Sequence, residues 1–399
     1  MKTSVQSCTH ETRKQGILAS PKIIICKLFN IWENRVPWPV KVRFWYHLMR
    51  LIFILNYKKK RILGIWDYKA LPWSVGDPLV FIEKLSILKI QHNAEEIDIC
   101  IVYDRENPGG NRRGSNLTPD NAQDYMLDFL PLFSTCPYLG SIFQFNSRKE
   151  YYQFLKNNFK RYDIFPSLGQ HLAETYNYNN GEPHLNEIQE FYNMHGYIPY
   201  LRIGDKDIYW ARWFYLSYLP EMTVPVTLSL RQISGDPERN ANPNVWLSFI
   251  DKCNMDFSEV IFVVVGLREE IFNGLRKRPN VIITKDFGTS IIEDLALIRT
   301  SLMYMGTNSG VNTIAQFSDL PHLIFQFPNI HKYGLNLGNN FSFATDKQKI
   351  FSSAIKVTPE LLYAEFKDLY SKLDRNQWRS VALENARIKH GHPSAVVEK

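Results

Sequence analysis

The sequence contains few cysteines, and none of them has the spacing of a metal site. Five cysteines are scattered over 399 residues. No two are placed as zinc ligands usually are, and an odd number argues against a disulfide framework. We therefore expect a reducing compartment, which excludes the small disulfide-rich secreted folds.

Two glycine-rich nucleotide-binding motifs are missing as well. The chain has no Gly-Lys-Ser or Gly-Lys-Thr, which argues against a P-loop NTPase, and no G-x-G-x-x-G, which argues against an NAD-dependent oxidoreductase. Apolar residues make up 45% of the chain and charged residues 22%, so broad disorder is excluded and a core for about two domains is possible.

The N-terminal segment, residues 1–60, lacks an apolar run long enough to cross a membrane. In residues 36–61 the longest uncharged stretch, Leu51 to Tyr57, is far short of the roughly 20 residues that a spanning helix needs. No small-residue cleavage site follows, so a cleaved signal peptide is not expected. We expect a cytoplasmic protein.

Most of the positive charge lies in this segment. Residues 1–61 hold 13 Lys and Arg against two Glu, whereas the rest of the chain holds 34 against 38 acidic residues. Within residues 36–61, aromatic and aliphatic side chains alternate with cations, which predicts an amphipathic helix on an anionic membrane surface. A helix packed on the body with solvated cations is the alternative. Nucleic acid is disfavoured because no nucleic-acid-binding motif is present.

The body alternates strand-like and helix-like stretches, which predicts an α/β fold with largely parallel sheets. The expected strands are 61–68, 97–104, 140–147, 197–203, 226–232, 259–266, 280–284, 301–306 and 321–327. The expected helices are 79–91, 122–133, 148–159, 184–196, 207–219, 244–253, 268–277, 290–300, 311–318 and 358–390.

This rhythm predicts two Rossmann-like domains that face each other across a cleft. The expected boundaries are 61–220 for the first domain and 221–355 for the second, with C-terminal helices at 356–399. Ligands of such sheets bind beyond the carboxyl ends of the strands, so the loops there are the candidate site.

Asp77 stands in the loop between the first strand and the first helix, directly after Gly76. A carboxylate near a helix N-terminus is stabilised as an anion and can accept a proton from a hydroxyl. The plainer interpretation is that Asp77 caps the helix that begins with Pro78. Both roles can coexist.

Two arginines follow the first strand of the second domain. Arg231 lies at the end of that strand and Arg239 in the loop after it. Guanidinium groups at this position can hold a diphosphate through paired hydrogen bonds and support a leaving nucleotide. Alternatively, the two side chains are simply solvated.

A glycine-bracketed turn, "GTNSG" at residues 306–310, stands where a strand hands over to a helix. Such a turn either allows close packing or presents backbone N–H groups to an anion. Thr307, Asn308, Ser309 and Gly310 would then offer hydroxyl, amide and N–H groups to a phosphate or a ribose.

Three stretches together resemble the GT-B glycosyltransferases. They are "SVGDPLVFIEKLSIL" in the first half, "SLR" at the start of the second and "MGTNSGVNTIAQFSDLPHLIF" near its end. The chain is most similar to the heptosyltransferase-like group, and its arginines are similar to those of bacterial fucosyltransferase-like enzymes. It departs from that group in having Asn308 in place of an acid and Thr313 in place of a histidine.

The resemblance implies a sugar transferase of cell-surface polysaccharide assembly. Asp77 would be the general base, Arg231 and Arg239 would hold the donor diphosphate, and residues 307–310 would line the donor pocket. A nucleotide sugar would be the donor and a glycan or lipid-linked acceptor the second substrate. No bound metal or other cofactor is expected, since no Asp-x-Asp motif is placed at a cleft. The alternative is a catalytically silent GT-B-like protein that binds a nucleotide sugar.

Overall fold

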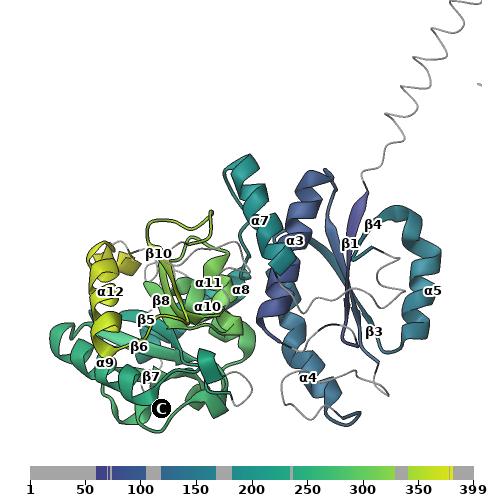
Figure 1. Cartoon of the computed structure of the whole chain (residues 1–399). Helices are drawn as coiled ribbons and strands as arrows, with labels where there is room; N and C mark the ends of the chain where they lie inside the picture. Colours follow the sequence, from purple (N-terminus) through teal and green to yellow (C-terminus); the bar gives the residue numbers. More distant parts are fainter. Residues whose placement is uncertain are drawn as a thin grey trace, which may run out of the picture. The chain divides into compact units, whose positions relative to one another are not determined.

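The computed structural model describes two parallel sheets with helices around them (Figure 1). The described residues are 60–69, 71, 74–104, 118–167, 182–233, 237–328, 340–376 and 378–380. The chain divides into two compact units, Met1–Lys59 and Lys60–Lys399. The predicted membrane-contacting segment therefore lies outside the described residues, apart from Lys60 and Arg61.

Lys60 and Arg61 are both paired with acidic side chains of the body. Lys60 Nζ lies 2.9 Å from an Asp163 carboxylate oxygen. Arg61 contacts Asp98 at 2.6 Å and Glu96 at 2.7 Å. The side chains of Lys60 and Arg61 therefore form ion pairs with the first sheet and the loop before β2. Within the described residues, no helix is long and apolar enough to cross a bilayer.

The first sheet has four parallel strands in the order β3-β2-β1-β4. Its strands are β1 (Arg61–Asp67), β2 (Ile97–Val102), β3 (Leu139–Phe145) and β4 (Tyr162–Phe165). Its helices are α3 (Gly76–Gln91), α4 (Ala122–Phe129), η2 (Leu130–Thr135), α5 (Arg148–Asn158), η3 (Phe159–Arg161) and α7 (Glu182–His195). The next helix, α8 (Asp205–Tyr218), packs against α10 (Ile291–Thr300) of the second sheet.

The second sheet has six parallel strands in the order β10-β9-β8-β5-β6-β7. Its strands are β5 (Val224–Ser229), β6 (Val260–Val265), β7 (Val281–Ile283), β8 (Met303–Thr307), β9 (His322–Phe327) and β10 (Gln348–Ser352). Its helices are α9 (Pro243–Asp256), α10 (Ile291–Thr300), α11 (Thr313–Gln316) and α12 (Pro359–Ser371), with the 3-10 turns η4 (Pro237–Arg239), η5 (Arg268–Glu270), η6 (Leu275–Lys277), η7 (Thr284–Phe287) and η8 (Gly310–Asn312).

Alternation along the strands sends neighbouring side chains to opposite faces. On β1, Leu63 and Ile65 join a core on the α5 side, whereas Ile62 and Trp66 join a larger core that continues through α3, α8 and α10. One face of the second sheet belongs to this larger core. The side chains on its other face pack against α9 and α12 (Figure 1). One apolar cluster thus runs from the helices of the first sheet to those of the second.

The structure confirms the predicted strand–helix alternation and differs from it in five places. The helix expected at 358–390 is α12, which ends at Ser371. Residues 197–203, expected as a strand, lie outside both sheets. The backbone N–H groups of Leu201 and Arg202 donate instead to the main-chain oxygens of Phe317 and Thr135. The helix expected at 268–277 is two 3-10 turns, η5 and η6. The strands β4 and β10, which close one edge of each sheet, were not predicted.

Candidate active site

Each sheet has one place where the strand order reverses. In the second sheet the chain continues from β5 to β6 and β7 on one side, then returns to β8, β9 and β10 on the other. The reversal therefore lies between β5 and β8. In the first sheet it lies between β1 and β4. Ligands of open α/β sheets bind at the carboxyl ends of the strands at such points. The predicted site residues lie at the end of β8, in the segments that follow β5 and β8, and in the first turn of α3, the helix after β1.

The loops after β5 and β8 are tied together by buried hydrogen bonds. The backbone N–H of Arg231 donates to Thr307 Oγ1 at 3.0 Å. The hydroxyl oxygens of Ser229 and Ser309 lie 2.9 Å apart. Thr307 is fully buried and Arg231 is only 2% exposed. The hydroxyl of Thr307 therefore helps to hold the start of the loop that carries Arg231 and Arg239.

Arg239 crosses over to the β8 loop. Its Nε and Nη2 donate to the main-chain oxygen of Asn308 at 3.3 and 3.1 Å. The Asn308 side chain accepts a hydrogen bond from Asn312 Nδ2 at 3.1 Å. Both predicted arginines thus contact the predicted 307–310 turn, and neither is simply a solvated side chain.

The loop that carries the arginines is braced from β9. Gln326 Nε2 donates to the main-chain oxygen of Asn240 at 2.8 Å and to that of Glu238 at 3.2 Å. Asn240 in turn exchanges hydrogen bonds with the backbone of Ile233, at 2.7 and 3.0 Å. These contacts fix the backbone on both sides of the loop, so Arg239 is held near Asn308.

The two glycines of the 306–310 turn permit close packing. A Cβ on Gly306 would overlap the main-chain oxygen of Ser229 on the neighbouring strand. A Cβ on Gly310 would lie 2.8 Å from the backbone nitrogen of Gly76, in the first turn of α3. The turn therefore brings the start of α3 against the loop after β8.

Asp77 lies in the first turn of α3 and does not cap it. The N-cap residue is Val75, which makes no side-chain capping hydrogen bond. The hydroxyl of Ser74 donates to the Asp77 carboxylate, and the Asp77 N–H donates back to Ser74 Oγ at 3.3 Å. The capping interpretation of Asp77 is thus wrong, because Asp77 is inside the helix and Ser74 binds its N–H. Gly76 packs against Gly310 of the loop after β8, and Asp77 is the residue that follows Gly76 in the sequence.

Glu270 is a site-edge residue that the sequence did not indicate. It is half-buried, and burial raises the pKa of its carboxyl group, whereas the Leu267 N–H at 3.2 Å and the charge of Arg231 lower it. A carboxylate next to a buried arginine offsets that charge and limits where the guanidinium can point. Sequence reasoning missed Glu270 because η5 was expected to be the start of a regular helix.

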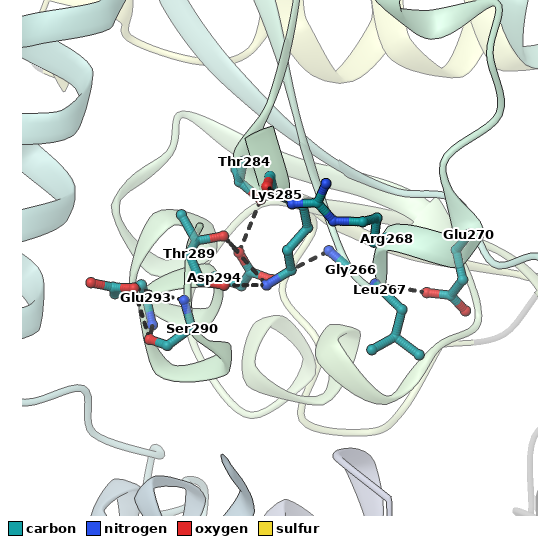
Figure 2. A network of polar contacts seen from close by, with 10 residues as sticks. All are labelled: Gly266, Leu267, Arg268, Glu270, Thr284, Lys285, Thr289, Ser290, Glu293 and Asp294. Atoms are coloured by element: carbon teal, nitrogen blue, oxygen red, sulfur yellow. Dashed lines mark hydrogen bonds and ion pairs between the residues drawn. The ribbon is translucent and has the colours of Figure 1, made fainter. Parts of the chain in front are cut away.

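Asp294 holds the turn that carries Glu270 (Figure 2). This α10 carboxylate is 2% exposed. It accepts from the Gly266 N–H at 3.4 Å and forms an ion pair with Lys285 at 2.8 Å. Thr284 and Thr289 also donate to it, at 3.0 and 2.7 Å.

This network connects the loops after β6 and β7 to the start of α10. Gly266 has φ of +126°, a conformation open to glycine, and the turn continues into Glu270. Burial raises the pKa of Asp294 while Lys285 lowers it. Ser290-x-x-Glu293 is a sequence pattern typical of a helix start, and its capping box is formed here, with Glu293 accepting from the Ser290 N–H at 2.7 Å.

The described residues contain no cluster of three or more His, Cys, Asp and Glu side chains that could hold a metal ion. The polar groups at the carboxyl edge of the second sheet are instead two arginines, an amide and three hydroxyls, from Arg231, Arg239, Asn308, Thr307, Ser309 and Ser229. Such a set suits an anion that makes several hydrogen bonds.

No protein-family model matches the chain, and no curated protein sequence matches it. Solved structures do. An ADP-heptose LPS heptosyltransferase II from E. coli aligns with a TM-score of 0.50 and 11% identity, over 78% of this chain and 99% of that one. A family 9 glycosyl transferase from Veillonella parvula aligns with a TM-score of 0.52 and 12% identity, over 80% of this chain and 98% of that one. At these identities the likeness concerns architecture, and the chain has the GT-B fold, with two Rossmann-like parallel sheets.

Proposed function

We propose that the protein is a glycosyltransferase that moves a sugar from a nucleotide-sugar donor to a hydroxyl of a glycan or glycolipid acceptor. The observation that carries the proposal is that the guanidinium of Arg239 and the backbone N–H of Arg231 both donate to the 307–310 turn, at the strand-order reversal of the second sheet. The GT-B fold supports it, since one structural neighbour named above is an ADP-heptose LPS heptosyltransferase and the other a family 9 glycosyl transferase.

The donor diphosphate is the natural ligand of the two arginines. Arg239 already spans the loops after β5 and β8, so a diphosphate bound there contacts both. As the bond between the anomeric carbon and the phosphate oxygen breaks, negative charge grows on the departing nucleoside diphosphate. Guanidinium groups that are fixed before the reaction stabilise this charge without having to reorganise.

Asp77 is the proposed general base. Its carboxylate takes the proton of the acceptor hydroxyl while that oxygen bonds to the anomeric carbon and the nucleoside diphosphate leaves. Ser74 donates to the Asp77 carboxylate and so sets its orientation in the first turn of α3. Transfer to a lipid-linked acceptor at the cytoplasmic membrane face is the finer proposal, which the basic composition of residues 36–61 supports.

The test is ligand-induced thermal stabilisation by nucleoside diphosphates and nucleotide sugars. We expect a rise in Tm with one nucleoside diphosphate, and a loss of that rise in Arg239→Gln with little change in the Tm of the free protein. Arg276→Gln is the matched control, because Arg276 is an exposed arginine of the same sheet unit that pairs with Asp286 at 2.7 Å. Equal loss in both variants, or no shift with any diphosphate, overturns the proposal.

A silent nucleotide-sugar-binding protein is the second candidate. It is favoured by Asn308, whose side chain is held by Asn312 where the resembling enzymes have an acid. Incubation of the protein with the stabilising nucleotide sugar separates the two functions. Release of nucleoside diphosphate, by transfer or hydrolysis, supports the enzyme, whereas binding without any turnover supports the silent protein.

A further inference from the structure

A large cavity lies at the edge of the second sheet where its strands begin, opposite the edge that carries the candidate active site. Its volume is about 820 Å³, within the range of small-molecule sites. Its walls include the residues just before β8, β9 and β10, which mark the amino ends of those strands. None of the residues assigned to the active site lines it.

Cations from four separate parts of the chain line this cavity. They come from the segment before α8, from α8, from the last turn of α10 and from the loop before β10, and two carboxylates also line the cavity. The cations are Arg202, Arg212, Arg299 and Lys347, and the carboxylates are Asp319 and Asp374. The lining therefore has an excess of positive charge.

Two of these cations have no carboxylate partner among the described residues. Arg299 pairs with Asp319 at 3.0 Å, and Arg202 lies 3.6 Å from Asp205. No ion pair within the described part of the chain involves Arg212 or Lys347. The Nε of Arg212 is also buried without a hydrogen-bond acceptor there. A buried N–H of a charged group without an acceptor is costly, and an anionic ligand would relieve that cost.

Some of the main-chain groups that would repel an anion here already have hydrogen-bond donors. The last carbonyl groups of α10 point toward this edge and carry the negative end of the helix dipole. The oxygen of Thr300 accepts from Trp378 Nε1 at 2.9 Å, and that of Leu297 accepts from Tyr215 OH at 2.6 Å. The oxygen of Ile298 accepts from Ser301 Oγ at 2.9 Å. These carbonyl groups are therefore occupied.

Aromatic walls complete the cavity. Trp378 is half-buried and fixed by its hydrogen bond to Thr300, and Tyr200 is 43% exposed. Flat rings and cations that line one cavity suit a ligand with a ring body and an anionic group.

We propose that this cavity is a second binding site, distinct from the active site, that takes a phosphate-bearing small molecule of the sugar phosphate class. The phosphate binds between Arg212 and Lys347, and the sugar ring packs on Tyr200 and Trp378.

Isothermal titration calorimetry of the full chain with glucose 6-phosphate, in phosphate-free buffer, tests the proposal. We expect one binding event that unphosphorylated glucose does not reproduce. Arg212→Gln and Lys347→Gln should each weaken it by about tenfold or more, since each removes a charge-assisted contact. Arg276→Gln should leave it unchanged, and all three variants should keep the wild-type Tm without ligand.

Arg239→Gln separates this site from the active site. It should keep glucose 6-phosphate binding while weakening nucleoside diphosphate binding. Loss of glucose 6-phosphate binding in Arg239→Gln with retention in Arg212→Gln and Lys347→Gln would place the ligand in the active site and overturn the proposal. Absence of binding at millimolar ligand also overturns it.

Discussion

Gly76 and Gly310 touch each other through their backbones. A Cβ on Gly310 would lie 2.8 Å from the nitrogen of Gly76, and a Cβ on Gly76 would lie 3.1 Å from the Cα of Gly310. The first turn of α3 and the turn after β8 can approach this closely because neither residue has a side chain. The contact joins α3, which follows the first sheet's strand β1 and contains Asp77, to the loop after β8 of the second sheet, which contains Asn308.

Substitution of Gly310 by alanine should weaken this contact. The added methyl group meets the backbone of Gly76 and the Cβ of Val75, neither of which is a flexible side-chain end. We expect Gly310→Ala to lower the free energy of unfolding by about 1–3 kcal/mol, as is usual when a close-packed position is overfilled. Chemical denaturation followed by circular dichroism measures this change.

Gly204→Ala is the matched control. A Cβ there would meet only the carboxylate of Asp207, 3.3 Å away on an exposed helix start, so the change should be clearly smaller. Gly76→Ala should resemble Gly310→Ala, and the double variant should cost less than the sum of the two because the substitutions disrupt one contact. Strict additivity would show that the two glycines act independently.

The sequence predicted the glycine-bracketed turn at residues 306–310. It did not decide whether the two glycines are there for close packing or for anion binding. The structure shows that Gly306 and Gly310 are required for packing, a relationship with Ser229 and Gly76 that local sequence cannot reveal. The positions of Arg231 and Arg239 after β5 could be predicted because strand ends are visible in a hydrophobic pattern. Glu270 was missed for two reasons: η5 was expected to be the start of a regular helix, and Arg231, whose charge lowers the pKa of Glu270, is distant in the sequence.

The Asp294–Lys285 ion pair should stabilise both the fold and the active-site edge. Removal of one member leaves the other buried and unpaired, so Asp294→Ala should lower the free energy of unfolding by about 3–5 kcal/mol. The turn from Gly266 to Glu270 also loses its anchor. We therefore expect weaker nucleoside diphosphate binding in the folded fraction, measured by calorimetry well below the Tm of the variant.

Two further variants distinguish the ion pair from general packing. Adding Lys285→Met to Asp294→Ala should restore part of the stability, because no charge remains uncompensated. The exposed Arg276–Asp286 pair is the control, and its removal should have little effect on stability. If the double variant is less stable than Asp294→Ala alone, Lys285 has another stabilising role.

Glu83 should make the protein less stable as the pH rises. This α3 side chain is fully buried, and neither carboxylate oxygen has a hydrogen-bond partner within the described residues. Burial raises the pKa of Glu83 well above its usual value. In the unfolded chain the Glu83 carboxyl group ionises as the pH rises through about 4.3. In the folded protein it stays protonated to a higher pH. The stability present below about pH 4.3 is lost progressively until the folded group also ionises.

Replacement of Glu83 by a nonionisable side chain tests this linkage. Glu83→Met should raise the free energy of unfolding at pH 7 by about 1 kcal/mol or more, because an unsatisfied polar group is removed from the core. Glu83→Gln should flatten the decline of stability above pH 4.3. Denaturation curves from pH 4 to 8 measure both effects, and an unchanged pH dependence in Glu83→Gln would assign the decline to other groups.

Asp77→Asn should abolish most glycosyl transfer while leaving the donor bound. Asparagine keeps an oxygen that can accept from Ser74, so the first turn of α3 is retained, but the amide cannot take a proton from the acceptor. We expect kcat to fall by about 10²–10⁴-fold, the usual effect of losing a general base, with the Kd for the nucleoside diphosphate unchanged. Release of nucleoside diphosphate in the presence of acceptor measures kcat.

Ser74→Ala provides the graded control for this assignment. It removes the hydroxyl that donates to the Asp77 carboxylate and that accepts the Asp77 N–H at 3.3 Å, without removing the base itself. Its kcat should therefore lie between those of the wild type and Asp77→Asn. Because Asp77 is adjacent to Gly76, Gly310→Ala should also lower kcat by displacing the base from the donor loop. Full activity in Asp77→Asn would refute its role as the base and would require a proton acceptor elsewhere along the carboxyl edges of the two sheets.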